Sequence, residues 1–251
     1  MLNDKHFYGV VIGSEILQNR REDAHFSFLR DVLLTRHYEL FSLSIIKDDP
    51  DLIRKTFQNI KEDPKAVLFS FGGIGSTPDD LTRAIAAEVF TEVPVQRHPQ
   101  FAKDIVTRFG DASFPFRICM SDIPEGSHLL PNPINNMSGF HLNQQYFFVP
   151  GFPEMAHPMV KYALENFFPI AQKQSKYSMM VYTSEDKLIP FMQELSKDVE
   201  LSCLPMMVEG KPQAELTLQS YDQKILDNSI EALLIFINLQ HFSYKILEEK
   251  R

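Results

Sequence analysis

Short apolar segments alternate with amphipathic helical segments over most of the first 170 residues of this 251-residue chain. The apolar segments with strand character are residues 7–12, 41–46, 66–71 and 146–149. The helical pattern covers residues 22–37, 50–63, 78–90, 94–109 and 153–167. Strands that alternate with helices in this way are joined by crossovers and pair in parallel. We therefore predict an α/β fold with a parallel sheet.

Three of the chain's 10 glycines lie between residues 72 and 75, directly after the predicted strand 66–71. Glycines this close together suggest a backbone that adopts positive φ and approaches a ligand closely. Pro78 follows at a position that can open a helix, with Ser76 or Thr77 near the helix cap. Free amides and the helix dipole would then meet at one point, where a phosphate group can bind. The alternative is a glycine-rich turn that only caps a helix.

Two aspartates, Asp79 and Asp80, fall in what we expect to be the first turn of that helix. A carboxylate there complements the helix dipole, which is a common structural role. Beside a bound phosphate, however, a carboxylate is repulsive unless a cation lies between the two groups. We therefore expect Mg²⁺ or another divalent metal at this turn. Asp80 is the preferred metal ligand, and for Asp79 the dipole role weighs slightly more.

Three other loops follow predicted strands, and each carries acidic side chains. They are Gly13-Ser14-Glu15, Lys47-Asp48-Asp49-Pro50 and Pro150-Gly151-Phe152-Pro153-Glu154. In a parallel sheet such loops all leave at the carboxyl edge, where ligands bind. We therefore expect their acidic side chains to converge on the glycine turn, although a helix cap or a solvated charge would explain each one alone. The acidic residues concerned are Glu15, Asp48, Asp49 and Glu154.

Composition argues against several other classes of protein. A net charge of -8 opposes a general nucleic-acid or anionic-membrane surface. Neither Cys119 nor Cys203 has the spacing of a zinc site or the context of a nucleophile, and a reducing compartment fits both. The longest apolar run, residues 233–237, is far below the roughly 20 residues that span a bilayer. We expect a cytoplasmic protein whose partner is a phosphorylated small molecule, not nucleic acid or membrane.

The composition turns polar at residues 172–176, and we place a boundary there between domains 1–170 and 171–251. The second domain has the pattern strand, helix, strand, strand, helix, which predicts a small α+β unit. Only Gly210 occurs after residue 176, so the Gly-x-x-Gly loop with which KH domains clamp RNA is missing. Nine Lys and Arg against 12 Asp and Glu give this domain a net charge of 9 - 12 = -3. We expect a dimerising or lid-like role.

Taken in order, several segments resemble the MoaB/Mog molybdopterin-binding domain, in the version found at the N-terminus of CinA-type competence/damage-inducible proteins. The resemblance extends over about residues 5–168, and residues 177–240 are similar to the KH-like domain that follows in CinA proteins. The segments that carry it are Gly13-Ser14-Glu15-Ile16-Leu17, Asp48-Asp49-Pro50, residues 72–82, Leu130-Pro131-Asn132-Pro133, Gly139-Phe140 and residues 150–155.

The resemblance implies a three-layer α/β/α domain with a mainly parallel sheet that binds molybdopterin or a nucleotide through its phosphate. It implies a catalytic or metal-associated role for Asp80, and it matches Asp48 and Asp49 to the family's acidic turn. In the CinA branch the implied activity is metal-dependent cleavage of ADP-ribose-like pyrophosphates, and the family forms homodimers and homotrimers. The ligand-binding residues we expect are Gly72, Gly73, Gly75, Ser76, Thr77, Gly13, Ser14, Glu15, Asn132, Pro150, Gly151 and Glu154.

The sequence departs from this family at Ser14, where an aspartate is usual, and in the segment Asn135-Asn136-Met137-Ser138 beside the pocket. Three hypotheses follow. The first is a divalent-metal-dependent pyrophosphatase that acts on ADP-ribose-like dinucleotides. The second is a molybdopterin-binding or adenylylating protein of molybdenum cofactor biosynthesis. The third is a non-catalytic binding module, which the loss of a carboxylate at Ser14 favours.

Overall fold

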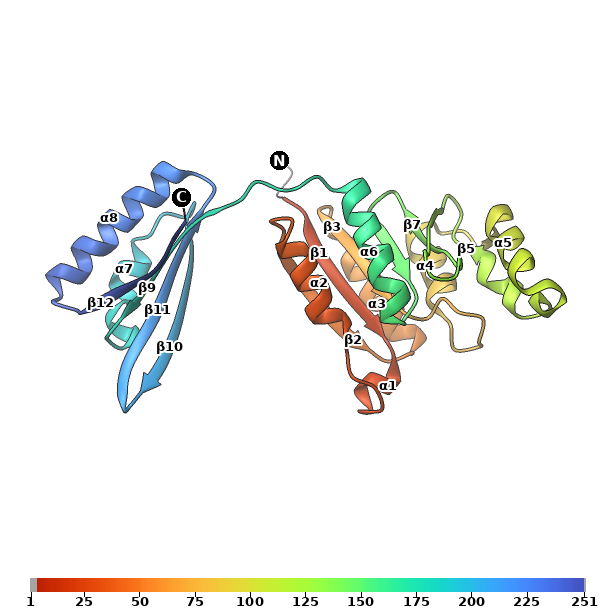
Figure 1. The fold of residues 1–251 in the computed structure, drawn as a ribbon, viewed down its shortest axis with the longest axis horizontal. Coiled ribbons are helices and arrows are strands. Elements are labelled where there is room, and N and C mark those ends of the chain that lie inside the picture. Colours follow the sequence, from red (N-terminus) through yellow and green to blue (C-terminus); the bar gives the residue numbers. More distant parts are fainter. Residues whose placement is uncertain (1–3, 251) are drawn as a thin grey trace. The chain divides into compact units, whose positions relative to one another are not determined.

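The computed structural model describes residues 4–250, and the chain divides into two compact units (Figure 1). The first unit ends at Ala171 and the second begins at Gln172. Each unit has its own hydrophobic core, so each is considered by itself.

A six-stranded sheet forms the centre of the first unit. Four neighbouring strands pair in parallel, and the last two pairings in the sheet are antiparallel, which confirms the predicted mainly parallel sheet. In spatial order the strands are β2 (Leu40–Ile46), β1 (His6–Ile12), β3 (Ala66–Phe71), β8 (Tyr146–Val149), β7 (Gly139–Leu142) and β6 (His128–Leu130).

Helices cover both faces of this sheet, so the unit has three layers. One core packs α2 (His25–Leu34) and α6 (Pro153–Phe167) against Val67 and Phe69 of β3. The other packs α3 (Pro50–Lys61) and α4 (Thr82–Phe90) against Leu68. Alternate side chains of a strand point to opposite faces, and here both faces are covered. This explains why all six residues of β3 are buried and mostly apolar.

A smaller lobe follows α4 in the chain. It contains α5 (Pro99–Phe109) and two short 3-10 helices, η1 (Gly110–Ser113) and η2 (Arg117–Ser121). The short strands β4 (Gln96–Arg97) and β5 (Asp122–Ile123) pair with each other beside them. Phe101, Ile105 and Ile118 form its separate apolar core.

Two predicted helix starts are wrong. The helix expected from Pro78 begins at Thr82, because residues 75–79 form bends and a turn, and Asp80 after them bonds back to the loop. The helix expected from Pro94 begins at Pro99, which takes the first helical position after His98 caps the helix. β3, β8 and α6 have the predicted bounds.

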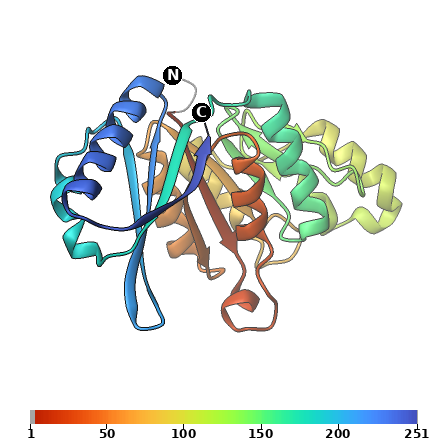
Figure 2. The same cartoon turned by 60° about the vertical axis from the view of Figure 1, so that its left-hand side comes forward.

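The second unit is a four-stranded antiparallel sheet with helices, as expected of a small α+β unit. Figure 2 shows α8 (Gln223–Leu239) lying along one face of this sheet, where Leu226, Leu233 and Ile237 enter the core. A short helix, α7 (Ile189–Gln193), follows the 3-10 turn η3 (Glu185–Lys187). In spatial order the strands are β10 (Glu200–Val208), β11 (Lys211–Ser220), β9 (Ser175–Val181) and β12 (Tyr244–Lys250). β12 was not predicted from the sequence.

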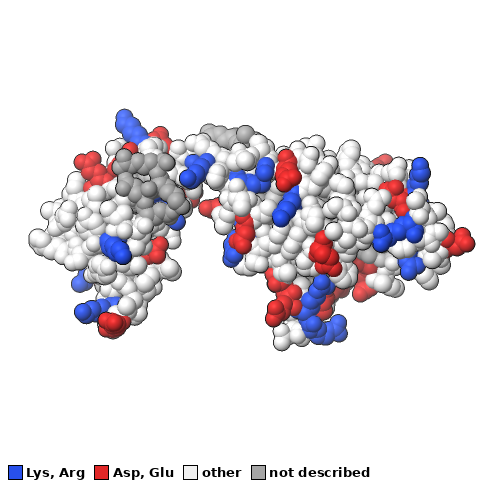
Figure 3. Space-filling view, viewed as in Figure 1, with Lys and Arg blue, Asp and Glu red and all other residues white. Residues whose placement is uncertain are grey.

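Charged side chains of both signs are interspersed over the face of the molecule drawn in Figure 3. Over residues 4–250, no helix is both long enough and apolar enough to cross a bilayer.

Candidate functional site

The loops at the carboxyl ends of the parallel strands enclose a cavity of about 570 Å³. Glu15 enters it from the short helix α1 (Ser14–Leu17), which follows β1, and Asp48 enters it from the loop after β2. The whole turn after β3, residues 72–77, lines the cavity, followed by Asp79 and Asp80. Pro150 and Gly151 line it from the loop after β8. We call this space the glycine-loop cavity.

Two glycines of the turn have the positive φ that the sequence predicted. Gly72 has a φ of 98° and Gly73 a φ of 69°. A Cβ atom on Gly72 would lie 2.4 Å from the carbonyl oxygen of Ile12, and one on Gly73 would lie 2.1 Å from Oγ1 of Thr82. Both the backbone conformation and the lack of space therefore require glycine here.

Asp80 lies before α4, not within its first turn as predicted. Its Oδ1 accepts a hydrogen bond from the amide of Gly75 at 2.7 Å. Its Oδ2 accepts from the amide of Thr77 at 2.8 Å and from the Thr77 hydroxyl at 2.6 Å. The carboxylate thus closes the glycine turn on itself and satisfies two of the amides that the sequence analysis assigned to a ligand.

Thr82 and Arg83 hold the carbonyl groups of the same turn. Oγ1 of Thr82 donates to the Gly72 carbonyl at 3.0 Å, and its amide donates to the Gly73 carbonyl at 3.0 Å. Nη1 of Arg83 donates to the Gly75 carbonyl. Both side chains are buried, and burial lowers the pKa of the Arg83 guanidinium. Within residues 4–250 the amides of Gly73, Ile74 and Ser76 have no hydrogen-bond acceptor.

Ser14 and Asp48 bond to each other at the edge of the sheet. The Ser14 amide donates to Oδ2 of Asp48 at 2.7 Å, and the Asp48 amide donates to Oγ of Ser14 at 3.3 Å. The start of α1 and the loop after β2, which bring Glu15 and Asp48 to the cavity, are therefore joined by these bonds.

Five of the predicted site residues do not line the glycine-loop cavity. Asp49 caps α3 by accepting a hydrogen bond from the Leu52 amide at 2.8 Å, which is the helix-cap role given as its alternative. Glu154 is exposed in the first turn of α6. The predicted residues outside the cavity are Gly13, Ser14, Asp49, Asn132 and Glu154.

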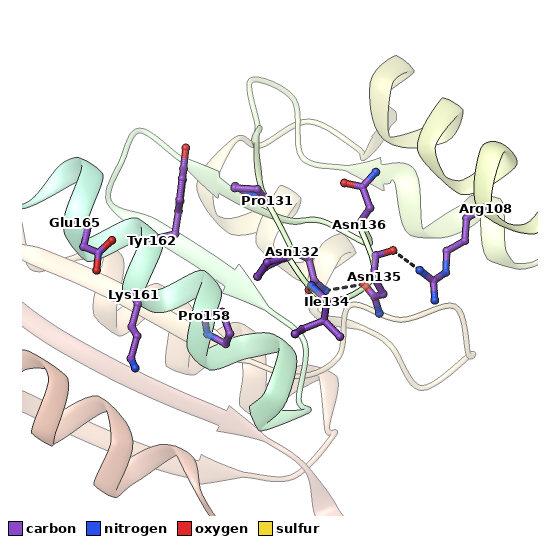
Figure 4. Close-up of a pocket in the computed structure, with 11 residues that line it drawn as sticks. Arg108, Pro131, Asn132, Ile134, Asn135, Asn136, Pro158, Lys161, Tyr162 and Glu165 are labelled. Atoms are coloured by element: carbon purple, nitrogen blue, oxygen red, sulfur yellow. Dashed lines mark hydrogen bonds between the residues drawn. The ribbon is translucent and has the colours of Figure 1, made fainter.

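Asn132 belongs to a separate surface groove of about 820 Å³, which Figure 4 shows beside α6. Its side-chain amide donates to Oδ1 of Asn135 at 2.8 Å and to the Met137 carbonyl at 3.0 Å. Arg108 donates to the Asn135 carbonyl across the same groove. Because these polar groups satisfy one another, they organise the loop 132–137, and this larger groove is the weaker candidate for a ligand site.

Two arginines on the cavity wall were not foreseen. The guanidinium of Arg21 lies 5.1 Å from the ring centroid of Phe152, and that of Arg117 lies 5.0 Å from that of Phe109. All four residues line the cavity. They come from two separate loops, the start of η2 and the end of α5, so no sequence spacing signals that they meet. The cavity therefore offers cations and aromatic faces as well as carboxylates.

The buried His25 and the partly buried His157 support the loop after β8. Nε2 of His25 lies 3.3 Å from the Gly151 carbonyl oxygen, and its Nδ1 lies 3.3 Å from Nε2 of His157. The His25 ring stacks on Phe71, and the His157 ring stacks on Phe28. Burial lowers the pKa of both histidines, that of His157 to about 4.

Carboxylate oxygens are ligands that Mg²⁺ prefers, and four acidic residues line the cavity: Glu15, Asp48, Asp79 and Asp80. Nevertheless, among the residues that the structure describes, no three His, Cys, Asp or Glu side chains are grouped closely enough to hold a metal ion. Within residues 4–250 these carboxylates therefore do not form a metal site by themselves.

A mainly parallel α/β sheet with a glycine-rich turn and a cavity at the carboxyl ends of its strands is typical of a small-molecule-binding domain. Residues 9–169 match the family model described as "Probable molybdopterin binding domain". This match covers well over half of the sequence, and the chain belongs to that family.

Two curated relatives carry names from the CinA group. A "CinA-like protein" of Acaryochloris marina is 26% identical over 181 residues, which are 69% of this chain and 42% of the relative. A "Putative competence-damage inducible protein" of Halothermothrix orenii is 23% identical over 234 residues, which are 90% of this chain and 56% of the relative. The chain thus spans about half the length of these relatives.

A solved structure supports the fold. The crystal structure of CinA from Thermoplasma acidophilum, described as a protein of unknown function, matches with a TM-score of 0.59 and 24% identity. The match covers 66% of this chain and 99% of that one. The MoaB/Mog-type CinA resemblance is therefore confirmed, whereas the KH-like character of residues 177–240 stays a prediction.

Proposed function

We propose that this chain binds a phosphorylated pterin or nucleotide in the glycine-loop cavity and cleaves the pyrophosphate of ADP-ribose-like dinucleotides with a divalent metal ion. The observation that carries the proposal is the convergence of unpartnered loop amides, two arginines and four carboxylates on one cavity. Amides and guanidinium groups bind phosphate oxygens, and carboxylates hold the cation that offsets the phosphate charge.

The dimensions and the walls of the cavity suit a nucleotide better than a bare phosphate. A volume of about 570 Å³ lies within the ordinary range for small-molecule sites. Phe109 and Phe152 offer aromatic faces on which a planar base or pterin can stack. The name of the family, which refers to molybdopterin, supports a pterin ligand.

Asp80, Asp79, Asp48 and Glu15 are the residues that would hold a divalent ion together with phosphate oxygens. A bound Mg²⁺ would supply charge stabilisation at the phosphate. In the reaction, a water oxygen forms a bond to one phosphorus while the bridging P–O bond breaks. One proton of the water passes to solvent, and ADP-ribose gives AMP and ribose 5-phosphate. Asp80 would keep the loop amides in place during this step through its bonds to Gly75 and Thr77.

The test is a screen of the purified chain with ADP-ribose, FAD and related dinucleotides against several divalent metals. We expect metal-dependent release of AMP from ADP-ribose. Asp80→Asn should lower the rate, because an amide cannot accept from both loop amides or hold a metal as a carboxylate does. Asp51→Asn is the matched control, since Asp51 is exposed on α3, pairs with Arg54 and lies outside the cavity. No cleavage with any metal would refute the hydrolase part of the proposal.

A non-catalytic binding module is the second candidate, and one observation favours it. Both carboxylate oxygens of Asp80 already accept hydrogen bonds from the loop, which leaves this residue fewer lone pairs for a metal. This candidate predicts that ADP-ribose or molybdopterin binds without turnover. ATP-dependent adenylylation of bound molybdopterin would favour an adenylylating protein of cofactor biosynthesis. Native mass spectrometry of the freshly purified chain would show which ligand is retained.

A further inference from the structure

The hydrogen bonds of the glycine turn are divided between two sides. Three carbonyl groups, those of Gly72, Gly73 and Gly75, accept from Thr82 and Arg83 at the start of α4. In a planar trans peptide, the carbonyl of one residue and the amide of the next point in opposite directions. Each carbonyl held by α4 therefore turns the following amide away from α4.

The amides that follow these carbonyls are those of Gly73, Ile74 and Ser76. They are the amides of the turn that lack an acceptor within residues 4–250, whereas those of Gly75 and Thr77 bond to Asp80. The alternation of free and occupied amides is thus explained by which carbonyls Thr82 and Arg83 hold. Several unpaired amides that face one side of a turn form a concave site for an anion.

Arg83 is placed in an unusual way for a cation. Its side chain is only 9% exposed, and its charge-assisted bond goes to the Gly75 carbonyl. Among the described residues no carboxylate lies within 4.0 Å of it, although Asp80 and Asp122 are near enough to act through space. A buried charge costs free energy unless it is well bonded. The bond of Arg83 to the Gly75 carbonyl offsets part of this cost and fixes the orientation of the peptide between Gly75 and Ser76.

We propose that Thr82 and Arg83 are positioning residues that turn the Gly73, Ile74 and Ser76 amides toward the cavity, where together these amides bind one phosphoryl group of the ligand. This inference rests on the proposed function, because it assumes that the ligand is phosphorylated. It assigns to Arg83 a role through the backbone and not through direct contact with the ligand, since Arg83 is not among the residues that line the cavity.

The test is amide-resolved NMR of the ¹⁵N-labelled full chain, titrated with inorganic pyrophosphate and with ADP-ribose. In the wild type we expect the signals of Gly73, Ile74 and Ser76 to shift together. In Arg83→Met the Ser76 shift should be lost, and the affinity for pyrophosphate should fall about tenfold, the typical effect of losing one hydrogen bond to a charged group. Thr82→Val should remove the Gly73 shift, whereas Thr82→Ser, which keeps the hydroxyl, should retain it.

Arg54→Met is the matched control, because it also removes one arginine but from a surface ion pair with Glu88 outside the cavity. Salt separates a positioning role from simple attraction. If Arg83 acts by direct Coulombic attraction, mobile ions screen it, and the loss of pyrophosphate affinity in Arg83→Met should shrink at high KCl. If Arg83 positions the loop, the loss of affinity should be the same at high KCl.

The outcomes distinguish the two proposals. If neither pyrophosphate nor ADP-ribose shifts any signal of the wild type, the proposed function fails. If the wild type responds at these amides and a folded Arg83→Met responds equally, only the positioning role is overturned. Should Arg83→Met not fold, Thr82→Val with Thr82→Ser decides the same question through the Gly72 carbonyl.

Discussion

The substitution Gly73→Ala tests how tightly the start of α4 holds the glycine turn. Gly73 has a φ of 69°, and an added Cβ would lie 2.1 Å from Oγ1 of Thr82. Gly126 provides a matched control, because its φ is 75° but a Cβ there would meet nothing within 4 Å. Both substitutions carry the same backbone penalty, about 1–2 kcal/mol for a left-handed residue. Only Gly73→Ala also displaces Thr82.

Displacing Thr82 removes the hydrogen bond from its hydroxyl to the Gly72 carbonyl. The buried acceptor is then unsatisfied, which costs about 1–3 kcal/mol more. We therefore expect Gly73→Ala to lower the free energy of unfolding of the first unit by roughly 2–5 kcal/mol. Gly126→Ala should lower it by about 1–2 kcal/mol. In a Thr82→Ala background the contact with Oγ1 is gone and the nearest atom is Cβ of residue 82 at 3.1 Å, so the penalty of Gly73→Ala should fall toward that of the control.

Hydrogen exchange of the β3 segment, Ala66–Phe71, is the appropriate assay. Its amides lie at the centre of the first unit, so their exchange reports the unfolding of that unit separately from the second. Equal penalties for Gly73→Ala and Gly126→Ala would refute the reasoning, and so would a penalty of Gly73→Ala that Thr82→Ala does not change.

Three further results are expected. Burial lowers the pKa of His25 and brings that of His157 to about 4, so below pH ~6.5 these two residues bind more protons in the unfolded chain than in the folded one. The free energy of unfolding should therefore fall as the pH drops from ~6.5 toward 4. His157→Phe should make the urea midpoint fall less steeply over this range. Asn132→Ala should cost about 1–3 kcal/mol in thermal unfolding, since it leaves the loop 132–137 without its buried amide; an unchanged melting temperature would contradict this. Phe152→Ala should weaken ADP-ribose binding in calorimetry by about 1–3 kcal/mol through lost stacking and leave pyrophosphate affinity nearly unchanged; equal losses for both would count against stacking.

The order of strands and helices in the first unit could be predicted because the local pattern and the tertiary fold agree. β3 is a continuous apolar run since both of its faces are covered, and Asp49-Pro50 forms the expected cap of α3. The start of α4 could not be predicted, because Pro78 satisfies a local rule for helix starts. Asp80 instead bonds to the loop amides, a contact that depends on the fold of the turn itself.

The acidic half of the cavity was predicted from the position of loops after parallel strands, which brought Glu15 and Asp48 to the glycine turn as expected. The cationic half was not, because Arg21 lies in a loop and Arg117 starts a short 3-10 helix, and neither segment has a periodic sequence pattern. β12 was missed for a similar reason. It lies at the edge of its sheet, where pairing with β9 alone suffices and no buried alternation is needed.

A crystal structure of the chain with ADP-ribose would test the central claim most directly. We expect one phosphoryl group within hydrogen-bond distance of the Gly73, Ile74 and Ser76 amides, with Asp80 still bonded to the amides of Gly75 and Thr77. A phosphate held instead in the groove of Arg108 and Lys161, with only water at the glycine turn, would contradict it.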